Sequence, residues 1–230
     1  INSLANMYKF NLIPQLVKKI HTKNRTIKTK LPTNSYLKTM KQLEKVEAQS
    51  MHGQIPILWD KAKNFSIYDD EGNKWIDFTS CIFVSNTGHS NKELKKNILK
   101  SLNSSLISTY TYMTKIKNEY LSKLLSFSKY KFEKAFLVSA GTEATEVALK
   151  LMRLHGIKYK KKKNLIICFK GNWHGRTMGA QIMAGINDQS NWIYNADKSF
   201  VYLDFPYPWS VKKNQTESFL NDQFKKLRQK

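Results

Sequence analysis

Two short apolar runs on either side of a helical pattern constrain the fold more than any other feature of this sequence. Residues 135–138 and 165–169 have the composition of buried strands. Apolar residues between them recur at helical spacing, namely Ala144, Val147, Ala148, Leu151 and Leu154. Gly156 is expected to end this helix. A strand–helix–strand order gives parallel strands joined by a crossover, so the sequence predicts an α/β fold with a mixed, mostly parallel sheet.

Further elements are expected on both sides of this core. Helical spacing predicts helices over residues 35–48, around residues 120–125 and over residues 216–227. Residues 65–68 and 75–78 alternate like two strands, and the Gly-containing turn between them predicts a hairpin. Ser90 and Glu93 form a capping-box pattern that predicts a helix starting there. Residues 1–34 are basic and weakly patterned, so a basic lead-in without regular structure is expected.

The chain carries a large excess of basic residues. Lysine and arginine number 39 against 17 acidic residues, which gives a formal net charge of +22. A nucleic-acid binder with such an excess would gather its basic residues on one face and would lose affinity steeply with salt. Because the basic residues are spread along the sequence, we interpret the excess as a general compositional bias and expect no nucleic-acid partner.

Neither a membrane span nor a cysteine-based site is expected. The sequence contains no apolar run of about 18 residues, the length that a spanning helix needs. Cys81 and Cys168 lie far apart and belong to no CxxC pair, so a disulfide framework or a metal site is not predicted. A reducing, cytoplasmic setting follows as the default expectation.

The turn after residue 138 is a candidate anion site. A strand is expected to end there, and a helix begins within the segment Ser139-Ala140-Gly141-Thr142-Glu143. The amides of a helix's first turn have no partners inside the helix, and the helix dipole favours an anion at that end. Gly141 would allow close approach of a phosphate, and Thr142 could add a hydroxyl donor. A tight strand-to-helix turn without a ligand remains the alternative, since many α/β proteins place small residues there.

A second candidate segment follows the strand expected at 165–169. It reads Gly171-Asn172-Trp173-His174-Gly175-Arg176-Thr177. Ligands of open α/β sheets bind outside the carboxyl ends of the strands, where both segments are expected. Trp173 could cover a flat heteroaromatic ring, His174 could donate or accept a hydrogen bond, and Arg176 could hold a carboxylate. Taken singly, these three residues also fit a core ring, a structural histidine and a surface charge.

Together the two segments resemble the class III (ω-amino) aminotransferases, which depend on pyridoxal phosphate. Residues 139–146 resemble that family's S-G-T-E-A-N-E segment, and residues 173–177 its aromatic-H-G-R-T segment. Upstream, residues 68–78 are similar to its "YDxxGxxYLDF" pattern, and residues 86–89 to its "N-x-G-H" segment. Four segments in the right order are far more specific than any one of them.

The resemblance implies a fold, a cofactor and roles for particular residues. It implies a fold-type I homodimer in which the amides of Gly141 and Thr142 hold the cofactor phosphate. Trp173 would stack on the pyridine ring with His174 beside it, and Arg176 would contact the substrate carboxylate. The substrates would be an amino donor and a 2-oxo acid acceptor. Residues 35–85 would belong to the small domain, and residues 86–230 would form the first part of the large, cofactor-binding domain.

The same resemblance also leaves a gap in the catalytic machinery. Transamination in this family needs a lysine that bonds to the cofactor and a carboxylate that keeps its pyridine nitrogen protonated. Both are expected beyond residue 230, so no catalytic residue is assigned here, and Lys170 is interpreted as ordinary. These 230 residues alone are therefore expected to be inactive. A cofactor-binding remnant without catalysis is the alternative. Cys81, where glycine is usual, is expected to crowd the cofactor side of the site.

Overall fold

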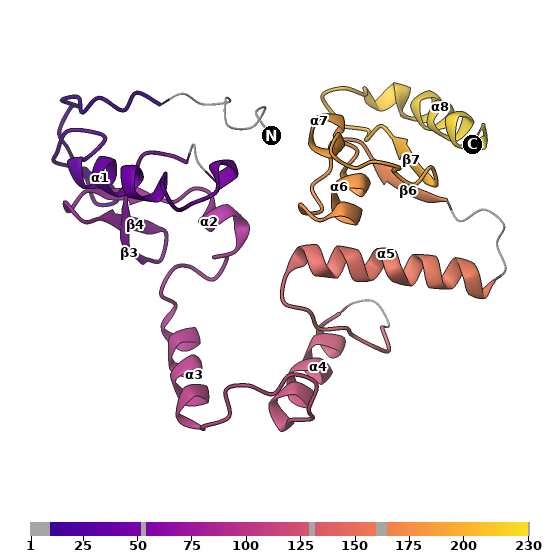
Figure 1. The fold of residues 1–230 in the computed structure, drawn as a ribbon, viewed down its shortest axis with the longest axis horizontal. Coiled ribbons are helices and arrows are strands. Elements are labelled where there is room, and N and C mark those ends of the chain that lie inside the picture. The colour runs from indigo at the N-terminus through magenta and orange to yellow at the C-terminus, as the bar shows by residue number, and fades with distance from the viewer. Residues whose placement is uncertain (1–9, 52–53, 129–131, 160–164, 230) are drawn as a thin grey trace. The chain divides into compact units, whose positions relative to one another are not determined.

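The computed structural model describes residues 10–51, 54–128, 132–159 and 165–229. They belong to two compact units, Ile1–Glu119 and Tyr120–Lys230 (Figure 1). The first unit holds a five-stranded antiparallel sheet, and the second holds a parallel pair of strands with helices around it. The predicted α/β fold class is confirmed.

The sheet of the first unit has the strand order β1-β2-β5-β4-β3. The bounds are Ile20–His21 for β1, Thr26–Ile27 for β2, Trp59–Lys63 for β3, Ser66–Asp69 for β4 and Lys74–Ile76 for β5. The predicted hairpin is confirmed, since β4 and β5 pair antiparallel with Ile67 opposite Trp75. Two strands lie within the predicted lead-in, where two residues each are too few for an alternation to show.

A buried polar turn connects β4 to β5. Asn73 is fully buried, and its amide nitrogen Nδ2 donates to Asp69 Oδ2 at 2.7 Å and to Thr29 Oγ1 at 2.8 Å. Its Oδ1 accepts from the Lys28 amide at 2.7 Å. The turn passes through Gly72 at φ 80°, a conformation that glycine adopts without strain. The bonds to Lys28 and Thr29 join the hairpin to the segment after β2. Each polar atom of the buried Asn73 side chain therefore has a partner.

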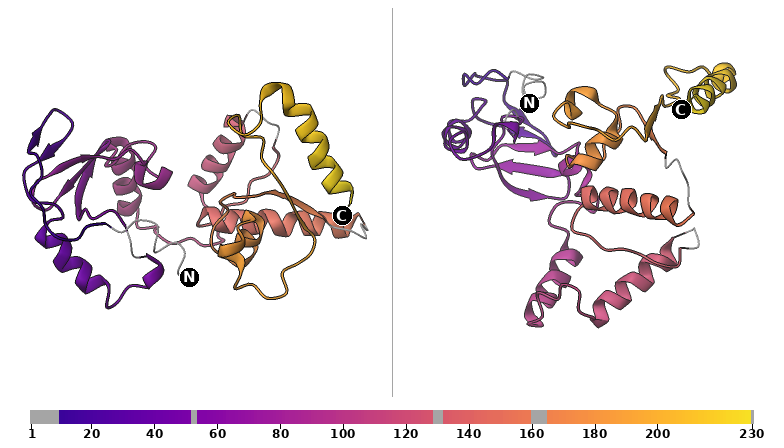
Figure 2. Two further views of the ribbon diagram at one scale, coloured as in Figure 1. Left: turned by 90° about the horizontal axis from the view of Figure 1, so that it is seen from above. Right: turned by 45° about the vertical axis from the view of Figure 1, so that its right-hand side comes forward.

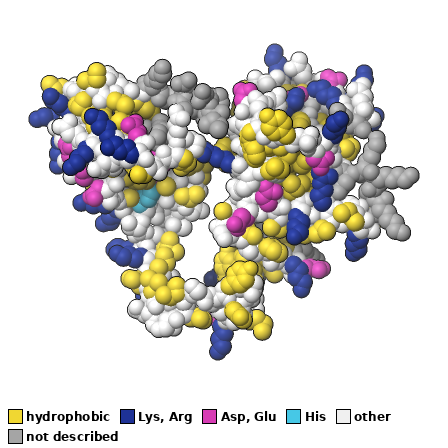
Figure 3. Space-filling view, viewed as in Figure 1, with side chains coloured by type: hydrophobic (Ala, Val, Ile, Leu, Met, Phe, Trp, Pro, Cys, Tyr) yellow, Lys and Arg dark blue, Asp and Glu magenta, His cyan; other side chains and the backbone are white. Residues whose placement is uncertain are grey.

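The described part of the first unit also contains three helices and a 3₁₀ turn, and a fourth helix crosses the boundary to the second unit. They are α1 (Asn34–Leu43), η1 (Gln49–Met51), α2 (Ser80–Phe83), α3 (Lys92–Asn103) and α4 (Lys115–Phe127). The helix predicted over residues 35–48 ends five residues early, and the helix predicted around residues 120–125 is α4. The apolar stripe of α3 lies on the surface, with Leu94 54% and Ile98 51% exposed (Figure 3).

The predicted capping box at Ser90 is wrong. Asn91 caps α3 instead, and its Oδ1 accepts from the Leu94 amide at 3.0 Å. Ser90 has a positive φ of 54°, and its hydroxyl donates to the Ala62 carbonyl at 2.7 Å. An asparagine and a serine are both good cap residues, so the backbone conformation of Ser90 decides between them.

The short helix α2 is a left-handed turn. All four of its residues have φ between 48° and 67°, which costs free energy for residues with a side chain. Asp77 holds this turn with four hydrogen bonds. Its Oδ1 accepts from the amide and the hydroxyl of Thr79, at 2.9 Å and 2.8 Å, and its Oδ2 lies 2.9 Å from the Cys81 amide and 2.7 Å from His89 Nε2.

The electrostatics of Asp77 follow from these contacts. Burial raises the pKa of its carboxyl, and the hydrogen bonds from His89, Thr79 and the Cys81 amide together lower it to about 2. The carboxylate is therefore ionised at neutral pH, and it anchors an otherwise strained backbone.

The second unit begins within α4, continues with a long helix, and then has strands that alternate with helices. Its elements are α5 (Gly141–Lys158), β6 (Ile166–Phe169), α6 (Met178–Ala184), α7 (Asn187–Ser190), β7 (Phe200–Leu203), η2 (Lys213–Gln215) and α8 (Thr216–Arg228). The strand expected at 165–169 and the helix expected at 216–227 are confirmed as β6 and α8. Figure 2 shows α5 as one continuous helix. It runs through the buried Gly156, so the stop predicted there is wrong. Gly156 lies in the helical backbone, whereas Gly185 at φ 62° does end α6.

The parallel pair that the sequence predicted is formed by other partners. β6 pairs with β7, not with residues 135–138, which form no strand and are exposed. A strand exists only where a neighbour supplies backbone partners, and no described residue supplies them to 135–138. The crossover between the parallel strands therefore contains α6 and α7. The lysine run at 160–163, which follows α5, lies outside the described residues.

A small apolar core holds the second unit together. Ile166 and Cys168 of β6 pack with Ile182 and Met183 of α6 and with Phe200 of β7. Alternate residues of β6 are buried, as expected for a strand with one covered face. Within the described residues, no helix combines the length and apolar character needed to cross a bilayer.

Candidate functional site

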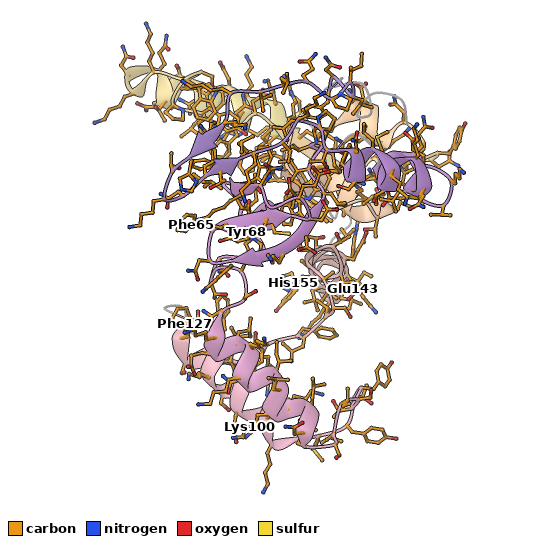
Figure 4. All side chains as sticks on the ribbon, turned by 90° about the vertical axis from the view of Figure 1, so that its left-hand side faces the viewer. Phe65, Tyr68, Lys100, Phe127, Glu143 and His155 are labelled. Atoms are coloured by element: carbon orange, nitrogen blue, oxygen red, sulfur yellow. The ribbon has the colours of Figure 1, made fainter. Side chains whose placement is uncertain are left out.

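The first turn of α5 presents backbone amides that have no partner within the helix. Ala140 is the N-cap residue, and its side chain makes no capping hydrogen bond. A Cβ placed on Gly141 would meet no atom within 4 Å, so the space beside this residue is open. Glu143 lies in the first turn, and its carboxylate accepts from the Ser139 amide at 2.7 Å (Figure 4). The helix dipole and the open space at Gly141 suit an anion at this end.

The Trp173–Thr177 segment packs directly against this helix. A Cβ on Gly175 would lie only 2.1 Å from Thr142 Oγ1, so the backbone of Gly175 touches the Thr142 side chain. Gly175 also has a φ of 119°, which side chains strongly disfavour. The Thr145 hydroxyl donates to the His174 carbonyl at 2.8 Å. The structure thus brings together the two segments that the sequence singled out separately.

Glu146 forms a second clamp between the same two elements. One carboxylate oxygen accepts from the Thr177 hydroxyl and, at 3.1 Å, from the Ala180 amide at the start of α6. Gly179 lies so close that a Cβ there would be 2.4 Å from the other oxygen. Glu146 and Lys150 are four residues apart on α5, a spacing that predicts an ordinary surface pair and does not indicate this clamp. The place of Glu146 within the resembling segment was the only signal that could have revealed it.

The indole of Trp173 is available at the surface of this unit. It is 61% exposed, and the guanidinium carbon of Arg176 lies 5.6 Å from its ring centroid. This distance allows a cation–π contact on one face of the ring. His174 is half-buried between Trp173 and Gly175. The first turn of α5 and the Trp173–Thr177 segment together offer helix amides, a flat ring and a guanidinium. This combination suits a planar molecule that carries a phosphate.

Lys170, at the end of β6, is engaged in an ion pair. Its Nζ lies 2.8 Å from Asp204 Oδ1, and Lys226 Nζ lies 3.1 Å from Asp204 Oδ2. The hydrogen bonds from these two lysines lower the pKa of Asp204. This ion pair gives Lys170 a structural contact, and the expectation that it is an ordinary residue stays a prediction.

Comparison with known proteins agrees with this geometry. The model of the family "Aminotransferase class-III" matches residues 47–230. The mitochondrial acetylornithine aminotransferase of Saccharomyces cerevisiae is 36% identical over 126 residues, which cover 52% of this chain and 30% of that protein. The acetylornithine aminotransferase of Clostridium acetobutylicum is 34% identical over 147 residues, covering 62% of this chain and 37% of the relative. The chain thus spans about a third of the length of these relatives.

Solved structures show the same fold. The ornithine aminotransferase of Toxoplasma gondii aligns with a TM-score of 0.68 at 16% identity, over 81% of this chain and 44% of that chain. An ω-transaminase of Pseudomonas jessenii, solved in complex with PMP, aligns with a TM-score of 0.68 at 17% identity, over 86% and 42%. With a family model that matches most of its length, the chain belongs to the class-III aminotransferases, whose cofactor is pyridoxal phosphate.

Proposed function

We propose that this chain is part of a transaminase that moves an amino group from an amine or ω-amino acid to a 2-oxo acid. The observation that carries the proposal is the packing of Gly175 on Thr142, which fixes the Trp173 segment beside the open first turn of α5. The membership in the class-III family supplies the reaction class, and the names of the ornithine-type relatives support a donor with both an amine and a carboxylate.

The residues present fit the cofactor. We infer that the amides of Gly141 and Thr142 bind its phosphate, since the N-cap has no competing side-chain bond. Trp173 would cover the ring with its exposed indole, and His174 would lie at the ring edge. Arg176 would bind the substrate carboxylate, for which its planar fork of donors is suited. When bound, pyridoxal phosphate supplies the electron sink of the reaction.

The whole protein is proposed to contain further catalytic residues. The lysine that bonds to the cofactor and the carboxylate at its pyridine nitrogen are assigned to sequence outside these 230 residues. The proposal keeps residues 35–85 as a small-domain segment and 86–230 as part of the large domain. A homodimer and a cytoplasmic location belong to it as well, and the free thiols of Cys81 and Cys168 support a reducing compartment.

The reading frame after Lys230 tests the proposed reaction. We expect a strand that carries an aspartate or glutamate, followed by a lysine at a later strand end. The protein with that extension should transfer an amino group to 2-oxoglutarate, and a variant with that lysine changed to alanine should not. A frame that contains neither residue would refute the transaminase.

Cofactor binding by this chain tests the site itself. We expect Trp173→Ala to weaken pyridoxal phosphate binding about five- to tenfold, because ring stacking contributes roughly 1 kcal/mol. Equilibrium dialysis measures the affinity, and pyridoxal without phosphate should bind far more weakly. Trp192→Ala is the control, since Trp192 is 51% exposed, donates to Gln181 and has no assigned role in the proposed site. Equal losses in both variants would contradict the assignment of Trp173, and a covalent absorption band that disappears in Lys170→Ala would overturn the structural role of Lys170.

A further inference from the structure

Four aromatic rings form a continuous ladder at the ends of β6 and β7. The centroids of Phe169 and Phe205 are 5.2 Å apart, those of Phe205 and Tyr207 are 4.9 Å apart, and those of Tyr207 and Trp209 are 4.6 Å apart. The last two rings are stacked, with planes only 16° apart. We call these four residues the aromatic ladder. None of them takes part in the proposed cofactor site.

The backbone holds the ladder in place without a ligand. Its last three rings alternate with Pro206 and Pro208, whose φ is fixed by the pyrrolidine ring. The Tyr207 amide donates to the Phe205 carbonyl at 2.8 Å, and the Tyr207 carbonyl accepts from the amides of Ser210 and Val211 at 2.9 Å each. Such a preformed arrangement loses little conformational entropy when something binds to it.

One end of the ladder is open. Trp209 is 80% exposed although one face of its indole is covered by Tyr207, so the opposite face is free to receive another flat ring. An indole with one free face at the end of a stack favours a planar aromatic ligand over an aliphatic one. Every nucleobase presents such a face, and stacking on it does not depend on the base sequence.

The charges around the open end favour an anion. Lys212 and Lys213 are exposed and lie three and four residues after Trp209, and no acidic residue stands between Asp204 and Glu217. At the other end of the ladder, Lys170 and Lys226 share the single carboxylate of Asp204, which leaves one excess positive charge there. Lysine and arginine elsewhere are spread over the visible face of each unit, so the net charge alone does not locate a site (Figure 3).

We propose that the aromatic ladder binds single-stranded nucleic acid, with one base stacked on Trp209 and the adjoining phosphates on Lys212 and Lys213. A stacking ring beside a basic segment is the arrangement by which proteins hold single strands without sequence preference. This site is independent of the proposed transaminase activity, and it makes nucleic-acid binding a local property of residues 169–213.

Fluorescence anisotropy of a labelled ten-nucleotide oligouridylate, titrated with the 230-residue chain, tests the proposal. Trp209→Ala should weaken binding between about 5-fold and 150-fold, the range of one base–aromatic stack. Its salt dependence should stay unchanged, because no charge is lost. Trp209→Phe should recover most of the affinity. Tyr194→Ala, which removes an aromatic side chain that is 89% exposed outside the ladder, should bind like the unchanged chain.

A variant that lacks the two lysines, together with competing polyanions, separates stacking on Trp209 from non-specific electrostatic attraction. The double variant Lys212→Ala, Lys213→Ala should reduce the slope of log affinity against log salt by about 1.4, as expected for two phosphate contacts with a single strand. Heparin or duplex RNA that binds as tightly as the oligouridylate, with Trp209→Ala unaffected, would overturn the proposal in favour of a charge effect. Uridine monophosphate that binds as tightly as the ten-nucleotide strand would also overturn it.

Discussion

Replacement of Gly175 by alanine is expected to lower the free energy of unfolding of the second unit by about 2–6 kcal/mol. Two costs add up at this position. A φ of 119° strains any residue with a side chain by roughly 1–3 kcal/mol. The new methyl group would also lie 2.1 Å from Thr142 Oγ1, and forcing extra atoms into a packed contact costs roughly 1–3 kcal/mol more. Urea unfolding followed by circular dichroism measures the loss.

Two other glycines of the same unit separate these costs. Gly171 has a φ of 74°, but a Cβ there would meet no atom within 4 Å, so Gly171→Ala should show the backbone strain alone. Gly141 has neither strain nor a close neighbour, so Gly141→Ala should change the stability by less than about 1 kcal/mol. A Gly175→Ala variant no less stable than Gly171→Ala would show that the Trp173 segment does not rest on Thr142 in solution.

The second large effect is expected at Asp77. Its side chain is only 3% exposed and accepts four hydrogen bonds. Asp77→Asn keeps the shape but replaces one acceptor oxygen by a donor, so either the Thr79 amide at Oδ1 or the Cys81 amide at Oδ2 loses its acceptor. Leaving a buried donor unsatisfied costs roughly 1–3 kcal/mol, and the loss of the charge adds to it, so we expect about 3 kcal/mol. Asp70→Asn is the control, because exposed Asp70 accepts from Ser35 at 2.8 Å.

The same carboxylate should make stability depend on acid pH. The pKa of Asp77 lies at about 2 in the folded chain, below its ordinary value of 3.8. A group with a lowered folded pKa stabilises the fold fully above its unfolded pKa, and this contribution is lost as the pH falls through the folded value. The unchanged chain should therefore lose stability between about pH 4 and pH 2. The Asn variant should lose less over that interval, and an identical pH profile in both would refute the role of Asp77.

The sequence predicted well those elements that depend on local patterns. The hairpin around Asp69–Asn73 and the helices α3, α4, α5 and α8 all follow from periodicity or turn chemistry within about a dozen residues. The prediction failed for residues 135–138, whose apolar composition was correct for a strand but whose pairing depends on a partner far along the chain. It also missed β7, although the turn residues Asp197 and Ser199 precede Phe200–Leu203 and Pro206 follows it.

The candidate site was predictable as two segments but not as one arrangement. Residue types at Gly141 and at Trp173 indicated a phosphate and a ring, and the interval between them matched a known family. The contact of Gly175 with Thr142 and the clamp by Glu146 depend on how α5 lies against the start of α6. No spacing rule within either segment contains that information. The aromatic ladder does have a signal in the sequence, the alternation of aromatic residues with proline at 205–209.

The buried turn at Asn73 also has a consequence for the order in which the first unit folds. The hairpin of β4 and β5 closes a short loop, so it can form early at little entropic cost. The bond from the Lys28 amide to Asn73 spans 45 residues and must form later. The bonds from Asn73 to Asp69 position that acceptor within the closed turn. We therefore expect the hairpin to form before the β1–β2 segment docks on it, and the strands nearest the N-terminus to join this sheet last.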